Sequence, residues 1–237
     1  MRYETVLLDA DDTLLDFHRS EREALSDMMN GMGVDPTEER LLAYSRINKA
    51  LWKALERGEI TKPRLIIRRF EEFMEYLSLP CDEERARSLA ETYMNALSQK
   101  GYFLEGAREL CEALYGKVRV YIVTNGVGFV QRGRQAISGL DRLVDGTFIS
   151  EVIGYEKPSP LYFEHVAAEI PNFSKETTLI VGDSLSSDIR GGVDFGIDTC
   201  WYNPKGLLPS EELAGKITYT VKDHKEIEQI IREGAGK

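Results

Sequence analysis

The sequence contains few of the residues that build metal-thiolate or disulfide sites. Its 237 residues include three cysteines, Cys81, Cys111 and Cys200, which are far apart and form no CxxC pair. Disulfide frameworks and zinc sites need regularly spaced cysteines, so neither is expected. The three histidines are equally scattered, and we interpret each as a surface or core residue.

Long apolar runs are also missing. No apolar stretch approaches the ~20 residues that a helix needs to cross a bilayer. The first apolar run begins within a few residues of Met1. We therefore expect no membrane partner, no signal peptide and a cytoplasmic location.

Positive charge is outnumbered as well, because 30 Lys and Arg face 40 Asp and Glu, which gives a formal net charge of −10. A nucleic-acid-binding surface needs a basic footprint, so nucleic acid is excluded as the expected partner. An anionic ligand would need local positive charge from a metal ion, a lysine or helix N-termini. The length allows one large domain or two modest ones, and 42% hydrophobic residues are typical of a folded protein.

The most informative stretch is Leu7–Leu15, which reads LLDADDTLL. A short apolar run that ends in acids is typical of a buried parallel strand, whose carboxyl end faces the ligand-binding crevice of an α/β sheet. Asp9 and Asp11 would repel each other by ~4 kcal/mol at ~4 Å and an effective dielectric constant of ~20. A bound cation, or a proton on one acid, would relieve this repulsion. The alternative is a solvated acidic turn.

The pattern from Ser20 to about Lys100 is helical throughout. We expect four amphipathic helices, near Ser20–Met32, from Pro36-Thr37 to Gly58 with Thr37 as N-cap, from Pro63 to Pro80, and over Asp82–Leu97. Four such helices without a strand indicate a small helical bundle, inserted after the first strand.

From about Tyr102 strands and helices alternate, as in a doubly wound parallel sheet of the α/β class. The expected strands are Val118–Thr124, Thr147–Ile149, Thr178–Val181, Thr199–Tyr202 and Ile217–Val221. The expected helices are Ala107–Tyr115, Pro160–Ile170, Leu185–Phe195 and Lys225–Arg232.

Four polar motifs follow strands or precede helices in this part of the chain. They are Asp9-Ala10-Asp11-Asp12-Thr13, Thr124-Asn125-Gly126, Lys157-Pro158, and Gly182-Asp183-Ser184 with Asp188. In a parallel sheet the carboxyl ends of the strands face one crevice. The four motifs would bring several carboxylates, an ammonium and a hydroxyl together there.

Each motif alone has a simpler structural explanation. Asp12 and Asp16 suit a turn or a helix N-cap, Lys157-Pro158 a helix entry, Thr124 a strand-end hydroxyl, and Asp188 an acid in the first turn of a helix. Gly182-Asp183-Ser184-Leu185 also spells a serine-esterase block, although no partner Asp-x-x-His follows it. Gly126-Val127-Gly128 is similar to a dinucleotide loop, but Gln131 replaces the third glycine.

Together, in this order, the motifs resemble the phosphatase branch of the haloacid dehalogenase-like (HAD) superfamily. The resemblance implies a HAD-type Rossmann-like core, formed by residues 1–15 and 102–237, with an inserted helical cap of residues 16–101. It implies a hydrolase in which Asp9 is the nucleophile and forms an aspartyl-phosphate, while Asp11 is the general acid and base.

The same resemblance implies the remaining site residues. Mg²⁺ is the implied cofactor, held by the carboxylates of Asp9 and Asp183, the main-chain carbonyl of Asp11, and Asp188 directly or through water. Thr124, Asn125 and Lys157 would bind the phosphoryl group.

The expected substrate is a small phosphomonoester. Asp9–Phe17, together with Asn48, Leu51-Trp52 and Gly58 before Ile60-Thr61, resembles the bacterial pyrimidine 5′-nucleotidase subfamily, which implies a nucleoside monophosphate. Phe17 or Trp52 would then stack on the base and Asn48 would bond its edge. Alternatively, Trp52 belongs to the helical core, and Arg64, Arg68 and Arg69 form a solvated face paired with Glu71, Glu72 and Glu75.

Other functions stay open on the sequence alone. They are phosphatase activity on another metabolite, such as a sugar phosphate or phosphoglycolate, a dehalogenase, a phosphosugar mutase, and a regulatory module phosphorylated on aspartate. A dehalogenase needs neither Mg²⁺ nor a second acid at Asp11. A receiver-type module is about half this length and lacks a cap.

Overall fold

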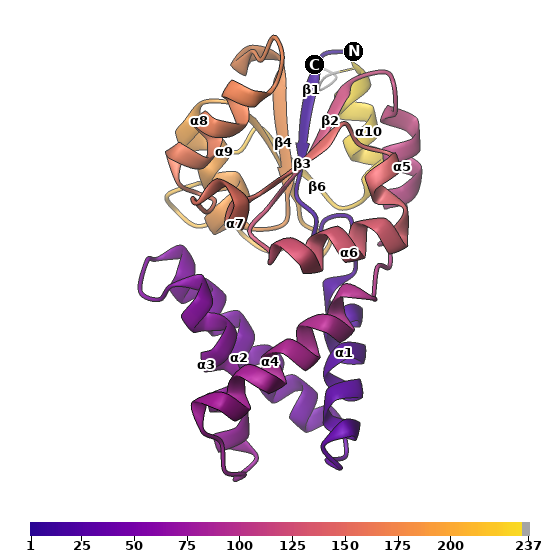
Figure 1. Cartoon of the computed structure of the whole chain (residues 1–237). Coiled ribbons are helices and arrows are strands. Elements are labelled where there is room, and N and C mark those ends of the chain that lie inside the picture. The colour runs from indigo at the N-terminus through magenta and orange to yellow at the C-terminus, as the bar shows by residue number, and fades with distance from the viewer. Residues whose placement is uncertain (234–237) are drawn as a thin grey trace. The chain divides into compact units, whose positions relative to one another are not determined.

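The chain forms two compact units in the computed structural model, which describes residues 1–233 (Figure 1). The sheet unit contains Met1–Phe17 and Gly101–Lys237, and the helical unit contains His18–Lys100. The end that we expected for the core, residue 237, lies outside the described residues.

The sheet unit is built on six parallel strands in the order β3-β2-β1-β4-β5-β6. Their bounds are β1 Thr5–Leu8, β2 Arg119–Thr124, β3 Gly146–Ile149, β4 Thr178–Gly182, β5 Asp198–Tyr202 and β6 Tyr219–Val221. The six predicted strands are therefore confirmed, with small shifts at their ends. The first strand in the chain lies in the middle of the sheet, between β2 and β4.

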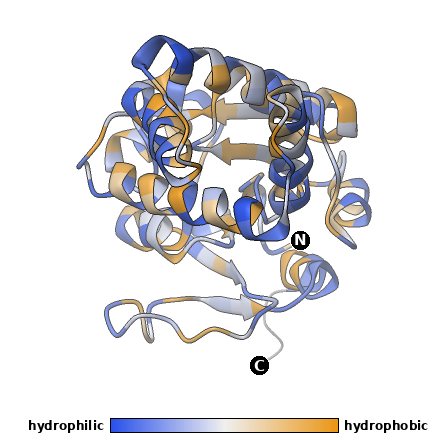
Figure 2. Ribbon diagram, turned by 90° about the horizontal axis from the view of Figure 1, so that it is seen from below, coloured by the Kyte–Doolittle hydropathy of each residue, from blue (hydrophilic) through white to orange (hydrophobic). Residues whose placement is uncertain are grey.

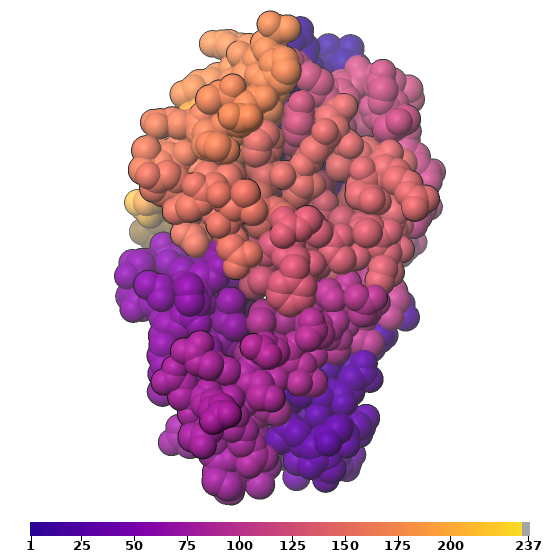
Figure 3. Space-filling model, in the orientation of Figure 1, coloured from indigo at the N-terminus to yellow at the C-terminus, as the bar shows by residue number. Residues whose placement is uncertain are grey.

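Helices cover both faces of this sheet. In Figure 1, α8 (Pro160–Glu169) and α9 (Arg190–Phe195) lie on one face, and α5 (Ala107–Leu114) and α10 (His224–Glu233) on the other. Leu7 of β1 packs in a cluster with residues of α8, while Val6 and Leu8 pack in the cluster that contains residues of α5 and α10. Alternate residues of a strand point to opposite faces, so β1 is buried on both sides. Residues from the middle of the chain, salmon to orange, form most of the face of this unit seen in Figure 3.

Two α-helices in the described part of the sheet unit were not predicted. They are α6 (Gly128–Ser138) and the short α7 (Ser150–Ile153). The buried residues of α6 include Gln131, Arg134, Gln135 and Ser138, so its inner face is polar. An apolar stripe is the sequence signal of an amphipathic helix, and α6 lacks one.

The single helix predicted over Leu185–Phe195 is wrong in detail. Leu185–Ile189 forms a turn of π-helix, and α9 begins only at Arg190. The wider turn places Asp188 within it, fully buried. Such turns are frequent at functional sites.

The helical unit contains the four predicted helices: α1 Phe17–Gly31, α2 Glu38–Glu56, α3 Lys62–Tyr76 and α4 Glu83–Ser98, the first residue of α1 belonging to the sheet unit. Its core includes a group of aromatic rings, and the ring of Tyr44 lies 5.3–5.4 Å, centre to centre, from the rings of Phe70, Phe73 and Tyr93. Hydrophobic and hydrophilic residues alternate along the helices in Figure 2, as expected for amphipathic helices. Thr37 is at the predicted N-cap position of α2, but its side chain makes no capping hydrogen bond.

None of the helices in residues 1–233 combines the length and the apolar composition that a membrane crossing requires.

Candidate active site

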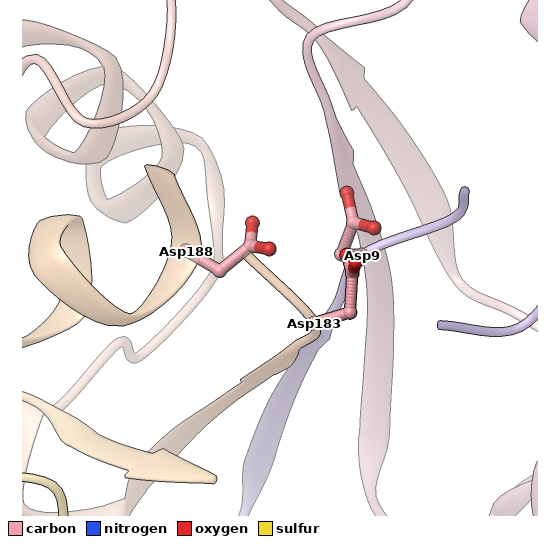
Figure 4. A group of neighbouring side chains, drawn as sticks. All are labelled: Asp9, Asp183 and Asp188. Carbon is pink, nitrogen blue, oxygen red and sulfur yellow. The ribbon is translucent and has the colours of Figure 1, made fainter. Parts of the chain in front are cut away.

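The carboxyl ends of the two central strands carry the acidic residues of the site. Asp9 follows β1 directly, and its main-chain N–H donates to the carbonyl of Val181 in β4 at 2.9 Å. Asp183 follows β4, and Asp188 lies in the π-helical turn after it. Figure 4 shows the three side chains converging from these segments.

The three carboxylates form a compact cluster. Asp9, Asp183 and Asp188 each offer an oxygen, and these oxygens lie within 4.8 Å of one another. Gly182 makes room for the third acid, because a Cβ at this position would lie 2.3 Å from the Cγ of Asp188. The main-chain N–H of Ser184 donates to Asp188 Oδ2 at 3.2 Å and fixes its orientation.

One buried lysine is paired with this cluster. The Nζ of Lys157 donates to Asp9 Oδ1 at 2.8 Å, to Asp188 Oδ1 at 2.6 Å and to the carbonyl of Val123 at 2.7 Å. Only 1% of the Lys157 side chain is exposed. All three ammonium hydrogens therefore have acceptors, which offsets the cost of burying the charge.

Burial and crowding change the protonation of these groups. Burial raises the pKa of Asp9 to about 7, with Asp188 and Asp11 adding to the effect and Lys157 opposing it. Burial, together with the charges of Asp9 and Asp188, raises the pKa of Asp183 well above its usual range. Burial alone would lower the pKa of Lys157, but the two neighbouring carboxylates outweigh it and raise that pKa. Negative charge is therefore in excess at this point.

The motif that follows β2 holds Lys157 in place. The Asn125 side chain accepts from the main-chain N–H of Lys157 and donates to its carbonyl, both at 2.8 Å. The Thr124 hydroxyl oxygen accepts from the N–H of Gly126 at 3.1 Å. Because that oxygen acts as acceptor, its hydrogen stays available for a ligand oxygen.

Asp11 is not part of the carboxylate cluster. Its Oδ2 accepts from Gln131 Nε2 at 2.6 Å, and its Oδ1 is paired with the guanidinium of Arg134. Both partners come from α6, and sequence reasoning missed them because it missed that helix. In the sequence, Gln131 served only to argue against a dinucleotide loop, because it stands in place of the third glycine.

A second set of missed residues supports Asp183. The main-chain N–H of Asp183 donates to the Thr13 hydroxyl at 3.0 Å, and Trp201 Nε1 donates to the Asp183 carbonyl at 2.9 Å. The buried His224 places Nε2 2.7 Å from the carbonyl of Thr13, so this nitrogen is the donor. No local sequence signal pointed to these roles, because the partners are far apart in the chain.

Asp12 and Ser184, which lie beside the site, have local structural roles. Asp12 has a positive φ of 58°, and its Oδ1 accepts from the N–H of Phe17 at 3.1 Å, at the beginning of α1. Asp12 is thus a turn residue, one of the two roles predicted for it, and its side chain accepts from the first residue of α1. Ser184 accepts from the N–H of Ser187 at 3.3 Å, which makes it the N-cap of the π-helical turn.

The proposed base-binding residues occupy different environments. Asn48 is buried in the helical unit, where it donates to Glu21 Oε1 at 2.8 Å and accepts from Arg69 at 3.4 Å. Its amide is therefore committed to two protein partners. Trp52 on α2 is half-buried, and so is Phe17, whose ring lies 5.5 Å from the Arg134 guanidinium carbon.

The expectation of a solvated arginine face is half right. Arg64 and Arg68 pair with Glu71 and Glu72 near the surface, as predicted. Arg69 is instead buried, with its guanidinium carbon 4.9 Å from the centre of the Tyr93 ring. The Arg69 side chain points from α3 into the helical unit, where its charge acts on Glu21.

A central β1 with an acid cluster at its carboxyl end, in a six-stranded parallel sheet, defines an α/β enzyme core. The family model for haloacid dehalogenase-like hydrolases matches residues 3–196. The chain belongs to this family, and it is a hydrolase, as the sequence motifs predicted.

Within the family, full-length relatives carry nucleotidase names. The chain is 38% identical to pyrimidine 5′-nucleotidase PynA of Streptococcus pneumoniae, covering 96% of this chain and 94% of PynA. It is 32% identical to pyrimidine 5′-nucleotidase YjjG of Escherichia coli, and the match covers 98% of this chain and 99% of YjjG. The resemblance to this subfamily is therefore confirmed.

Solved structures agree with this assignment. The structure of the putative HAD-hydrolase YfnB from Bacillus subtilis, bound to magnesium, matches with a TM-score of 0.90 and 35% identity, over 98% of this chain and 99% of that chain. The structure of L-2-haloacid dehalogenase from Xanthobacter autotrophicus matches with a TM-score of 0.73 at 17% identity. The match covers 98% of this chain and 100% of that chain, so the two proteins share the fold.

Proposed function

We propose that this chain is a Mg²⁺-dependent phosphomonoester hydrolase that acts through an aspartyl-phosphate on Asp9. The main support is the cluster of Asp9, Asp183 and Asp188 with the buried ammonium of Lys157, at the carboxyl ends of the central strands. The sheet unit would be the catalytic core and the helical unit the cap.

The donor set fits a magnesium ion. Three carboxylates with oxygens within 4.8 Å are hard oxygen ligands, and a single ammonium does not neutralise them. Burial and the neighbouring acids raise the pKa of Asp9, and a cation among these carboxylates would offset the same crowding of negative charge. The ion would be held by Asp9, Asp183 and Asp188, directly or through water, and by the Asp11 main-chain carbonyl. When bound, it would neutralise charge on the carboxylates and the phosphoryl oxygens.

The first chemical step uses Asp9 and Asp11. A carboxylate oxygen of Asp9 forms a bond to phosphorus while the bond from phosphorus to the leaving oxygen breaks. The leaving oxygen takes the electron pair of that bond and a proton from the Asp11 carboxyl, so that an alcohol departs. General acid help of this kind is typically worth ~10²–10⁴-fold in rate.

The second step regenerates the enzyme. Water attacks the phosphorus of the aspartyl-phosphate, gives a proton to the Asp11 carboxylate, and releases phosphate as the bond to Asp9 breaks. Lys157 holds the nucleophile in position and offsets negative charge in both steps. The Thr124 hydroxyl and the main-chain N–H of Asn125 would donate to phosphoryl oxygens.

We further propose pyrimidine nucleoside monophosphates as the substrate class. The relatives that span this chain, PynA and YjjG, are named pyrimidine 5′-nucleotidases. Among the residues considered for base binding, Trp52 and Phe17 are half-buried, and stacking of a ring on a base is worth ~1–3 kcal/mol per base. Asn48 is the weakest of the three candidates because both ends of its amide are already bonded.

A phosphate-release screen tests this proposal. Uridine, thymidine, cytidine and purine monophosphates would be compared with sugar phosphates and phosphoglycolate, each with MgCl₂ and with a chelator. We expect Mg²⁺-dependent release that is fastest with the pyrimidine nucleotides. A preference for sugar phosphates would reject the substrate class but keep the phosphatase. Halide release from a haloacid in chelator, without phosphate release, would reject the reaction itself.

A further inference from the structure

Two side chains of α6, Gln131 and Arg134, hold the carboxylate of Asp11 by both of its oxygens. Residues three apart on a helix lie on the same face, and here that face is buried. Gln131 Nε2 donates to Oδ2 at 2.6 Å, and the guanidinium of Arg134 is paired with Oδ1. The two contacts therefore fix both the position and the rotation of the carboxylate.

The arrangement is built into the chain on both sides of α6. At Gly126 a Cβ would lie 2.3 Å from Gln131 Nε2, so the missing side chain leaves room for the amide. At Gly101 a Cβ would lie 2.3 Å from the Arg134 carbonyl, so this glycine lets the chain pass against the helix. Neither glycine has the positive φ that would explain it by backbone conformation alone.

Burying these two side chains is costly in free energy, which an incidental surface contact would not be. The Arg134 side chain is completely buried while 28% of the Asp11 side chain is exposed. A buried guanidinium is costly unless it is paired, so the contact with Asp11 offsets the cost of burying Arg134. The Oε1 of Gln131 is buried without a hydrogen-bond partner among the described residues, because the amide presents its donor side to Asp11.

We propose that Gln131 and Arg134 are positioning residues that aim Asp11 at the leaving oxygen and the attacking water. The inference rests on the proposed phosphatase function. Each carboxylate oxygen has two lone pairs, so one donor on each oxygen leaves a lone pair free for the proton in transit. Neither α6 residue needs to touch the substrate, because each acts through Asp11.

The test compares two esters that differ in their need for an acid. Phenolate leaves phenyl phosphate poorly without a proton, whereas dinitrophenolate leaves 2,4-dinitrophenyl phosphate without one. For each ester, the value of kcat/KM covers the steps up to departure of the phenolate or dinitrophenolate. Gln131→Met keeps the size of the side chain and removes the donor, and Arg134→Lys keeps the charge and removes the planar fork.

We expect Gln131→Met to lower kcat/KM for phenyl phosphate by about 10- to 100-fold, because a small displacement of a catalytic group has an effect of this size. For the dinitrophenyl ester we expect a loss below about threefold, since the acid contributes little there. In an Asp11→Asn background the same substitution should have no further effect, because its partner is gone. Arg134→Lys should show the same selective loss.

Gln135→Met is the matched control. Gln135 lies on the same helix, is equally buried, and contacts Thr147 at 2.7 Å instead of Asp11. It should leave the ratio of the two kcat/KM values unchanged. Equal losses on both esters with Gln131→Met, or an additive loss with Asp11→Asn, would overturn this inference while the wild type still turns over both esters. Absence of turnover by the wild type would reject the proposed function as well.

Discussion

The ammonium group of Lys157 lies 2.8 Å from Oδ1 of Asp9, and both side chains are buried. The residues are 148 positions apart in the chain. Asn125 holds the backbone of Lys157, and β1 places Asp9, so the pair is supported from both sides. This contact keeps the proposed nucleophile oriented and offsets part of its charge.

Replacing Lys157 with methionine should impair both activity and stability. The loss of a charge-stabilising donor in an active site costs about 10²–10³-fold in kcat. Breaking a buried ion pair costs about 3–5 kcal/mol of unfolding free energy. Phosphate release and urea unfolding in chelator would measure the two effects. Lys175→Met is the control, because this exposed lysine contacts Phe195 and lies outside the site. Unchanged turnover in Lys157→Met would contradict the account.

Magnesium should bind the cluster of Asp9, Asp183 and Asp188 in the absence of substrate. Isothermal titration should detect this binding, and Asp183→Asn should weaken it at least tenfold. The affinity should fall as pH drops below about 7, because the Asp9 carboxyl, with a pKa of about 7, is then protonated and the ion must displace the proton.

Asp194→Asn is the matched control for this titration. Asp194 is an exposed acid on α9 that pairs with Arg190, outside the cluster. Its replacement should leave the affinity unchanged. Equal weakening by Asp194→Asn and Asp183→Asn would show that Mg²⁺ binds to general negative charge rather than to the cluster.

Gly182→Ala should disturb the site through Asp188. The added methyl group would lie 2.3 Å from Asp188 Cγ and Oδ2, so the carboxylate must move away. We expect lower Mg²⁺ affinity and turnover reduced by about 10-fold or more, since sub-ångström placement matters in catalysis. Gly31→Ala has open space around its Cβ and should be neutral. Normal Mg²⁺ affinity in Gly182→Ala would mean that Asp188 is not a ligand.

The buried acid of the helical unit predicts a dependence of stability on pH. Burial raises the pKa of Glu21 above 4.5, although hydrogen bonds from Ser45 and Asn48 oppose the shift. The folded state then keeps a proton that the unfolded state releases, so stability falls as pH rises from about 4.5 toward the raised pKa. Glu21→Gln removes this titration and keeps an acceptor for Asn48.

Denaturant unfolding of Glu21→Gln and the wild type at several pH values tests this prediction. The variant should gain stability relative to the wild type as pH rises to neutral, and the difference should shrink near pH 4.5. A difference that is the same at all pH values would show that folding does not raise the pKa of Glu21.

Much of the fold was predictable because its signals are local. The apolar run before Asp9, the alternation after Tyr102 and the apolar stripes of the four inserted helices each depend on neighbouring residues. The parallel arrangement then follows from the strand–helix order, and it brings the acids of β1 and β4 to one edge. Asp9, Lys157, Asp183 and Asp188 were accordingly named from the sequence.

What the sequence did not reveal depends on distant or polar contacts. Helix α6 was missed because its buried face contains Gln131, Arg134 and Gln135 instead of an apolar stripe. Gln131 contacts Asp11 across 120 positions of sequence, a pairing that no local pattern encodes. Arg69 was expected at the surface because arginine usually lies there, and its contacts with the rings of Phe70 and of Tyr93 on α4 reverse that preference.

The most direct test of the central claim is steady-state phosphate release by Asp9→Asn with MgCl₂ and either uridine monophosphate or phenyl phosphate. Asparagine has nearly the same shape but is a far weaker nucleophile, so no aspartyl-phosphate forms. We predict turnover at least ~10³-fold below the wild type, with cooperative unfolding retained, since the acyl-phosphate route is then closed. Turnover within tenfold of the wild type would contradict the assignment of Asp9 as nucleophile.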